Sequence, residues 1–306
     1  MKYVAPSYYR DFECIASACR HSCCVGWEVD VDEGALALYG EMTHPYAEKI
    51  RDSIDTGGTP HFRLDARERC PHLAENGLCN IITECGEQSL CLICRDHPRY
   101  RNFYEGVTEL GLGLSCEEAA RLALENTSGF LVSESEDMSC ATYYREYPSE
   151  LFSEEEIPLA EEKKRLLELV EDASVSLSEL DSALLGIALD FSELKELYLS
   201  LEALDGEWKG RIESLSAEDF DSKFQIYGDL TRRAISAVVY RHISSESFFL
   251  PSVIGVFAAV TARLVAALAT DSSDFADTLR AWSAEVEYST ENTEKILDFI
   301  EEKLPI

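Results

Sequence analysis

The stretch CIASACRHSCC, residues 14–24, places four cysteines within one short segment of the chain. Ten of the eleven cysteines lie in the first 116 residues, and the six that follow this segment are Cys70, Cys79, Cys85, Cys91, Cys94 and Cys116. Residues 1–10 lack the apolar core of a secretory signal, so we expect a cytoplasmic protein whose thiols stay reduced. Thiolates in a reducing compartment are typical ligands of metals and iron–sulfur clusters. The sequence therefore predicts a fold built around an inorganic centre.

The spacing of the cysteines bears on which centre this is. Only Cys19–Cys23 and Cys91–Cys94 have the short separation that is typical of a tetrahedral zinc site, whereas a [4Fe–4S] cluster accepts more varied spacing. We therefore favour a [4Fe–4S] cluster, with zinc as the alternative. Neighbouring side chains rarely reach one metal, so one of Cys23 and Cys24 is expected to face a second centre or the core. Two four-ligand centres would use eight cysteines and one centre would use four.

Some residues near these cysteines are not assigned as ligands. Free cysteine packs as a small apolar residue, and this explanation is preferred for Cys85, Cys91 and Cys140. Histidines among turns are more often surface or core residues than ligands, and this applies to His21, His61, His72 and His97.

The distribution of turn residues and apolar periodicity divides the chain into three parts. Residues 1–130 are rich in Gly and Pro and predict a loop-rich, cysteine-rich metal-binding domain with few short strands. Residues 131–156 are rich in Ser, Glu and Tyr and are expected to form a linker. Residues 157–306 carry helical periodicity and predict an α-helical bundle, so the fold class is mainly α.

Individual helices follow from the apolar spacing. In the bundle we expect helices over 160–170, 177–204, 220–243, 250–268, 275–286 and 290–304, with Ser176 and Ser216 as N-caps. Nearer the N-terminus, Val29–Asp32 is expected as a short strand, Glu33–Tyr39 as the start of a helix and Leu90–Arg95 as the end of one.

Net charge excludes some classes of partner. The charge of −31 argues against nucleic-acid binding, because it would repel phosphates. It comprises −9 through residue 130 and −22 beyond it, which fits either a solvated helical surface or attraction of a lysine-bearing partner. The most apolar segment, residues 248–268, contains Pro251, Thr261 and Arg263, so we interpret it as a buried core helix and expect no membrane association.

Several segments resemble the flagellin lysine-N-methylases, a family that belongs to a broader group with a zinc- or iron-chelating cysteine motif. The resemblance covers roughly residues 10–125. It is carried, in the family's order, by residues 12–14 and 17–27 (FEC and SACRHSCCVGW), 70–73 (CPHL), 77–79 (GLC), Cys94, Pro98-Arg99, Glu109, 112–116 (LGLSC) and 118–121 (EAAR).

The resemblance implies an enzyme, a protein-lysine N-methyltransferase that moves a methyl group from S-adenosylmethionine to surface lysines of flagellin. It further implies a metal-ligand set of Cys14, Cys19, Cys23, Cys24, Cys70, Cys79, Cys94 and Cys116. Two other matched residues suit the chemistry, since Arg99 could clamp the cofactor carboxylate and Glu109 could hold or deprotonate the lysine ammonium. The structural alternative for both is an ion pair or a turn brace.

Two functions from other classes fit the same residues. One is a metal-binding or metal-carrying protein without catalysis, whose helices dock a partner. The other is a redox sensor in which Cys23, Cys24 and nearby thiols oxidise reversibly.

Overall fold

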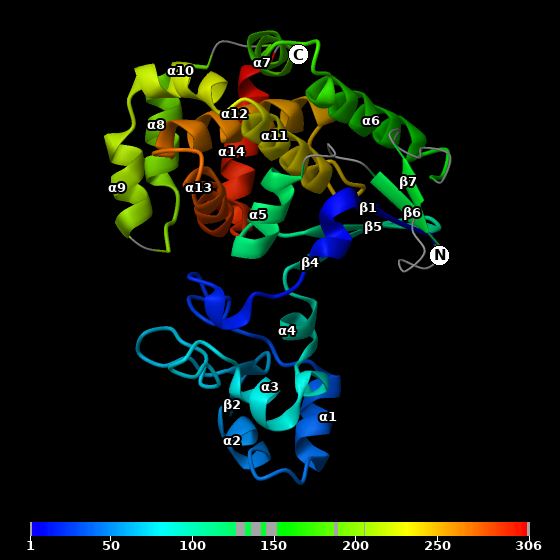
Figure 1. Ribbon diagram of the computed structural model, residues 1–306, viewed down its shortest axis with the longest axis vertical. Helices are drawn as coiled ribbons and strands as arrows, with labels where there is room; N and C mark the ends of the chain where they lie inside the picture. Colours follow the sequence, from blue (N-terminus) through cyan, green and yellow to red (C-terminus); the bar gives the residue numbers. More distant parts are fainter. Residues whose placement is uncertain are drawn as a thin grey trace. The chain divides into compact units, whose positions relative to one another are not determined.

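The computed structural model describes residues 2–126, 132–135, 142–144, 152–186, 189–204 and 206–304. The chain divides into two compact units (Figure 1). The cysteine-rich unit comprises residues 13–99 and 116–118, and the helical unit comprises residues 1–12, 100–115 and 119–306. The predicted boundary at residue 130 differs from this division. Residues 1–12 and 100–115 belong with the helices because they supply strands of the sheet in the helical unit.

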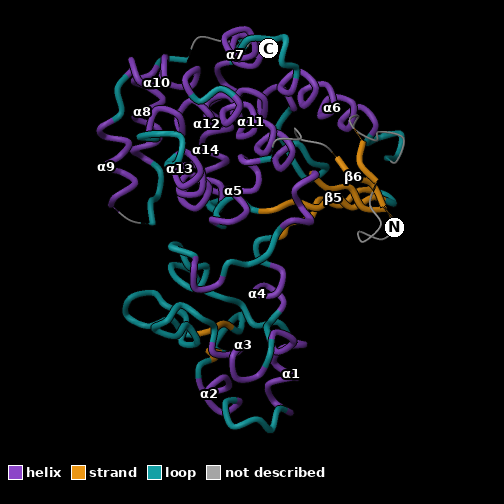
Figure 2. Tube along the Cα trace, in the orientation of Figure 1, coloured by secondary structure: helices purple, strands orange, loops and turns teal. Residues whose placement is uncertain are grey.

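That sheet has the strand order β4-β5-β1-β6-β7. Figure 2 colours the strands orange and the helices purple. The strands of the sheet are β1 (Lys2–Pro6), β4 (Arg99–Tyr104), β5 (Val107–Leu112), β6 (Val132–Ser135) and β7 (Thr142–Tyr144). Strand β1 pairs in parallel with β5, where Val4 lies opposite Glu109, and antiparallel with β6. The predicted linker, residues 131–156, therefore includes β6, β7 and the described residues from Phe152, and its remainder lies outside the described residues.

Most of the helical unit is α-helix, which confirms the mainly α prediction. Its helices are α5 (Glu117–Glu125, whose first two residues belong to the cysteine-rich unit), α6 (Ile157–Glu171), α7 (Leu177–Leu185), α8 (Phe191–Ser200), α9 (Gly206–Ser214), α10 (Ala217–Ile226), α11 (Asp229–His242), α12 (Pro251–Leu268), α13 (Phe275–Trp282), a π-helical turn (Ser283–Glu287) and α14 (Thr290–Lys303). Helix α12 is long and apolar enough to cross a membrane, but 78% of it is buried inside the protein. It packs against α10, α11, α7 and α14 and is the core helix that the sequence predicts.

The predicted helix boundaries need correction at two places. The segment 177–204 forms α7 and α8, because Gly186 adopts a left-handed conformation (φ 57°) and Asp190 caps a new helix. The segment 220–243 forms α10 and α11, which meet at Gly228 (φ 49°). Helix α9 was not predicted. The caps at Ser176, which forms a complete capping box, and at Ser216 are confirmed.

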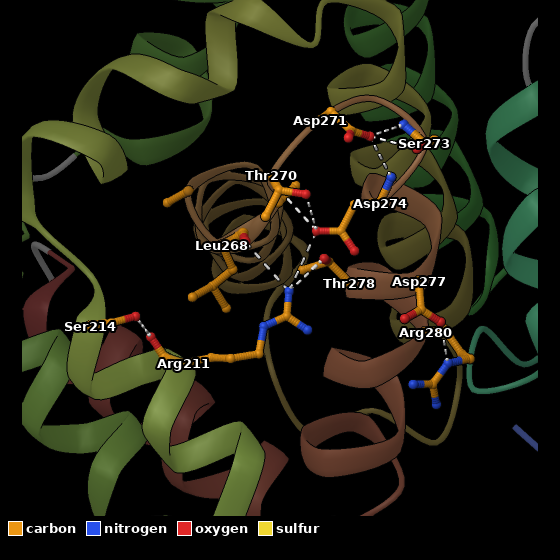
Figure 3. Close-up of polar contacts among 12 residues, drawn as sticks. Arg211, Ser214, Leu268, Thr270, Asp271, Ser273, Asp274, Asp277, Thr278 and Arg280 are labelled. Atoms are coloured by element: carbon orange, nitrogen blue, oxygen red, sulfur yellow. Dashed lines mark hydrogen bonds and ion pairs between the residues drawn. The ribbon is translucent and has the colours of Figure 1, made fainter.

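The connection between α12 and α13 is held by polar contacts (Figure 3). Arg211 of α9 donates to the Thr278 hydroxyl at 2.7 Å and to the Leu268 carbonyl at 3.4 Å. Asp274 accepts the backbone N–H of Thr270 at 2.9 Å. These contacts give the last carbonyl groups of α12 a partner from another helix, so α9 is attached to the end of the core helix.

The cysteine-rich unit has little regular structure. It contains β2 (Ile54–Asp55), β3 (His61–Phe62), α1 (Glu33–Glu41), α2 (Ala47–Asp52), α3 (Asn80–Cys85) and α4 (Leu92–Asp96). The helix expected from Glu33 is confirmed, and the Leu90–Arg95 segment contributes the short helix α4. The strand expected at Val29–Asp32 is wrong, because only Asp30 forms an isolated bridge, with His61.

A buried ion pair joins the sheet to the helices of the helical unit. Lys163 of α6 donates to the Glu109 carboxylate of β5 at 2.8 and 3.0 Å, and both side chains are at most 1% exposed. Glu109 also accepts from Asn102 and Tyr104, and Lys163 donates to the Tyr240 carbonyl. Burial raises the pKa of Glu109 and lowers the pKa of Lys163, so each charge depends on the other.

Replacing only one member of this pair is expected to be costly. Lys163→Met leaves Glu109 as a buried charge without its partner, and the free energy of unfolding should fall by about 3–5 kcal/mol. The double variant Glu109→Gln/Lys163→Met should lose much less. Urea unfolding followed by the helical circular dichroism signal checks both. Equal losses in the single and double variants would contradict this account.

Candidate metal centre

Six cysteines gather in the core of the cysteine-rich unit. Cys70 and Cys91 are buried there, and partly buried Cys24, Cys79, Cys85 and Cys94 pack against the same core. We call the five whose thiols interact electrostatically with one another, that is, all but Cys85, the inner thiol group. The backbone brings their loops together, since the N–H of Cys70 donates to the Cys24 carbonyl at 2.8 Å and Leu73 forms a bridge with Cys79. Each of these thiols lies within the electrostatic range of others in the group.

The Cys91–Cys94 turn is held by a carboxylate outside the cysteine pattern. Asp32 caps α1 by accepting from the Ala35 N–H at 3.0 Å, and its other oxygen accepts from the Leu92 N–H at 2.7 Å. The second contact keeps the pKa of Asp32 below its usual value. Asp32 therefore positions the turn in which the Cys91 and Cys94 side chains are hydrogen-bonded to each other.

Four other cysteines form a second set, which we call the outer thiol group: Cys14, Cys19, Cys23 and Cys116. The Cys23 side chain interacts electrostatically with those of Cys14 and Cys116, and the Cys19 side chain interacts with that of Cys116. An ion pair ties their segments together, because Glu117 accepts from Arg20 Nε at 2.9 Å and from the Arg20 N–H at 2.8 Å. The outer group is more exposed than the inner group.

The adjacent pair Cys23 and Cys24 lies where the two groups meet. Cys23 has its other neighbours in the outer group, whereas Cys24 is a neighbour of Cys70, Cys79 and Cys94 in the inner group. The two thiols are hydrogen-bonded, which raises the pKa of Cys23 and lowers that of Cys24 to about 7. This arrangement is what the sequence leads us to expect for neighbouring cysteines that serve different surroundings.

Thiols are suitable ligands for a metal cation, although the positions of these side chains do not form a metal site. Among residues 2–126 and the other described segments, no three Cys, His, Asp or Glu side chains are arranged to hold a metal ion. Burial nevertheless raises the pKa of Cys70 to about 12 and that of Cys19 to about 11. Such thiols become thiolate ligands at neutral pH only when a metal replaces the proton. The ten described cysteines form no disulfides, so all retain this capacity.

Two of the histidines near the cysteines, His72 and His97, lie in largely buried surroundings. His72 is fully buried, and its ring nitrogens contact Tyr46 Oη at 3.1 Å and Ser53 Oγ at 2.9 Å. Burial lowers the pKa of both His72 and His97 to about 4. His72 therefore has hydrogen-bond partners for both ring nitrogens and acts as a neutral core residue.

The remaining predicted site residues lie in different places. Glu109 is fully buried in its ion pair with Lys163, which favours the structural alternative over a catalytic role for this carboxylate. Arg99 begins β4 and is half-buried. Cys85 lies 3.4 Å from His44 Nδ1, and Cys140 lies outside the described residues. The ligand set expected from the sequence omits Cys91, whereas the structure places Cys91 among the inner thiols. The C-x2-C spacing between Cys91 and Cys94 is the sequence feature that could have identified it.

The chain is similar to curated proteins from Salmonella. It is 26% identical over 149 residues to a "Flagellar biosynthetic protein FliU" of Salmonella muenchen, a match that covers 46% of this chain and 88% of that protein. It is 27% identical over 136 residues to proteins named "Lysine-N-methylase" from Salmonella choleraesuis and Salmonella typhimurium. These matches cover 42% of this chain and only 34% of each methylase. No family model matches the chain, and no solved structure matches it.

The contact between Asp32 and Leu92 generates a prediction about thiol protection. Asp32→Ala removes both the α1 cap and the acceptor that holds the Cys91–Cys94 turn, so Cys91 should be alkylated several-fold faster. A matched control is Ser176→Ala, which removes an N-cap in the helical unit and costs a similar ~1 kcal/mol. Timed iodoacetamide labelling with mass spectrometry measures both. Equal Cys91 labelling in the two variants would show that Asp32 does not position this turn.

Proposed function

We propose that this chain is an S-adenosylmethionine-dependent protein-lysine N-methyltransferase that acts on flagellin, and that its cysteine-rich unit holds a thiolate-ligated centre. The observation that carries the methyltransferase part is the similarity to two proteins named lysine-N-methylase. The match to a flagellar biosynthetic protein supports flagellin as the substrate. The grouping of nine thiols in the cysteine-rich unit supports the centre.

The two thiol groups define which residues would hold the centre. Cys24, Cys70, Cys79 and Cys94 of the inner group belong to the ligand set that the family resemblance implies, and Cys91 lies beside them. The outer group offers four thiols for a second centre. A [4Fe–4S] cluster remains the favoured occupant and zinc the alternative, since both take four thiolates. Such a centre would stabilise a unit that has short helices and few strands.

Methyl transfer to lysine has two requirements that the protein must meet. The amine must be neutral, and it must approach the sulfonium methyl group in line. No electron transfer is required, so we assign the thiolate-ligated centre a structural or cofactor-orienting role. The high negative charge of the chain would draw a lysine-rich surface toward it and raise the rate of encounter.

A redox sensor is the second candidate, and one observation favours it. Cys91 precedes α4 and shares a C-x2-C turn with Cys94, and the hydrogen bond from Cys94 lowers the pKa of Cys91. The C-x2-C turn and the lowered thiol pKa are two features of thiols that oxidise reversibly. A reversible Cys91–Cys94 disulfide in metal-free protein, together with no binding of S-adenosylmethionine, would favour this function over methyl transfer.

The content of the centre tests the assignment of the thiols. Protein purified without oxygen should contain iron with equal acid-labile sulfide, or zinc. Cys24→Ser and Cys23→Ser should each reduce the metal content, because they remove a thiol from the inner and the outer group. Cys85→Ser is the matched control, since Cys85 belongs to neither group. Full metal content in both Cys23→Ser and Cys24→Ser would remove these residues from the ligand set.

The enzymatic activity is tested on the same preparation. Incubation with S-adenosylmethionine and purified flagellin should add 14 Da increments to flagellin lysines, as measured by peptide mass spectrometry. Flagellin whose lysines have been acetylated beforehand should gain none. Absence of methyl-lysine from the reaction with metal-loaded protein would count against a flagellin methyltransferase.

A further inference from the structure

A polar pocket of about 260 Å³ lies in the helical unit, apart from the thiols. It is formed by the first half of β4, the end of α11 and the turn that follows α11. Among its lining residues are Arg101, Asn102, Arg241, His242 and Glu246. The turn is attached to β4, since Ser245 Oγ donates to the Phe103 carbonyl at 2.8 Å. All of these residues belong to one compact unit, so the pocket does not depend on the placement of the cysteine-rich unit.

Arg241 is held rigidly at this pocket. Its guanidinium lies over the Tyr100 ring at 4.8 Å and the Tyr288 ring at 5.1 Å, and its Nε lies 3.3 Å from the Glu287 carboxylate. The Tyr100 ring lies against Gly111, where a Cβ atom would have no room. Glu287 ends the π-helical turn and contacts His242 at 2.9 Å. The position of the guanidinium is therefore set by packing on three sides.

One terminal nitrogen of Arg241 lacks a hydrogen-bond partner among the described residues. Its Nη1 is buried and forms no hydrogen bond, although a buried charged donor without an acceptor is costly. π-Helical turns such as the one that carries Glu287 occur frequently at functional sites. Arg241 is also among the residues that line the pocket, so its guanidinium lies beside any ligand bound there.

The lining side chains suit a ligand that carries both charges. Arg101 and Arg241 supply donors for a carboxylate, and Glu246 supplies an acceptor for an ammonium group. Glu287 forms an ion pair with Arg241, and the other lining residues include one basic side chain, Arg101, and one acidic side chain, Glu246. Two aromatic side chains of the adjoining segments, Phe103 and Phe248, are 56% and 97% exposed and could cover an attached ring system.

We propose that this pocket binds the α-amino-acid group of a small ligand, with Arg101 and Arg241 at its carboxylate and Glu246 at its ammonium. The inference rests on the proposed function in one respect: it identifies that ligand as S-adenosylmethionine. An α-amino acid joined through sulfur to an adenosine matches a pocket lined by both charges, whose adjoining segments carry exposed aromatic rings.

Isothermal titration calorimetry with S-adenosylhomocysteine on the metal-loaded protein tests the pocket. Arg101→Gln and Glu246→Gln, both at exposed positions, should each raise the Kd about ten-fold, which is the value of one charged hydrogen bond. Arg165→Gln, which removes an exposed arginine from α6, is the matched control and should bind like the wild type. Wild-type affinity in both pocket variants, or no binding by the wild-type protein, would overturn the proposal.

The methyl-transfer assay separates this proposal from the proposed function. If the pocket variants methylate flagellin with an unchanged KM for S-adenosylmethionine, the pocket is wrong while the function stands. If Arg101→Gln weakens binding but the wild-type protein transfers no methyl group to flagellin, the pocket stands and the flagellin assignment fails.

Discussion

The pairing of β1 with β5, joined to the buried Glu109–Lys163 ion pair, is the constraint on which the helical unit depends. The pairing places Val4 opposite Glu109, and the Glu109 side chain binds a lysine from α6. Residues close to the N-terminus and residues beyond position 100 therefore share one sheet, although about a hundred positions separate them in the chain. Because neither charge of the ion pair is exposed, removing either one leaves the other buried without its partner.

This constraint makes the cysteine-rich unit an insertion. Residues 13–99 leave the helical unit after β1 and return to it at β4. The inserted residues form only short helices and two-residue strands, and their core combines six thiols with a larger number of aliphatic and aromatic side chains. A region with so little regular structure would gain stability from the proposed centre, since each thiolate–metal bond would restrain a loop.

The proposed chemistry is divided between the two units. The thiols belong to the cysteine-rich unit, whereas the Arg101–Arg241–Glu246 pocket belongs entirely to the helical unit. Glu109 supplies an instructive contrast with Arg241. Both are charged residues of the helical unit, but Glu109 is fully buried with partners at both carboxylate oxygens, whereas Arg241 is 19% exposed and its Nη1 forms no hydrogen bond with the described residues. Only the second arrangement leaves hydrogen-bonding capacity for a ligand.

The sequence by itself determined the local features of this protein. The mainly α class, the buried apolar helix α12 and the caps at Ser176 and Ser216 all follow from residues within one or two helical turns of each other. The sequence also shows that the cysteines cluster in the N-terminal part. It leads us to expect that the adjacent residues Cys23 and Cys24 have different neighbours. Tertiary structure alone decided the insertion, the neighbours of Cys91, the partner of Glu109 and the pocket around Arg241. Each of these depends on contacts between distant segments, and apolar periodicity shows which face of an element is buried but not which distant element covers it.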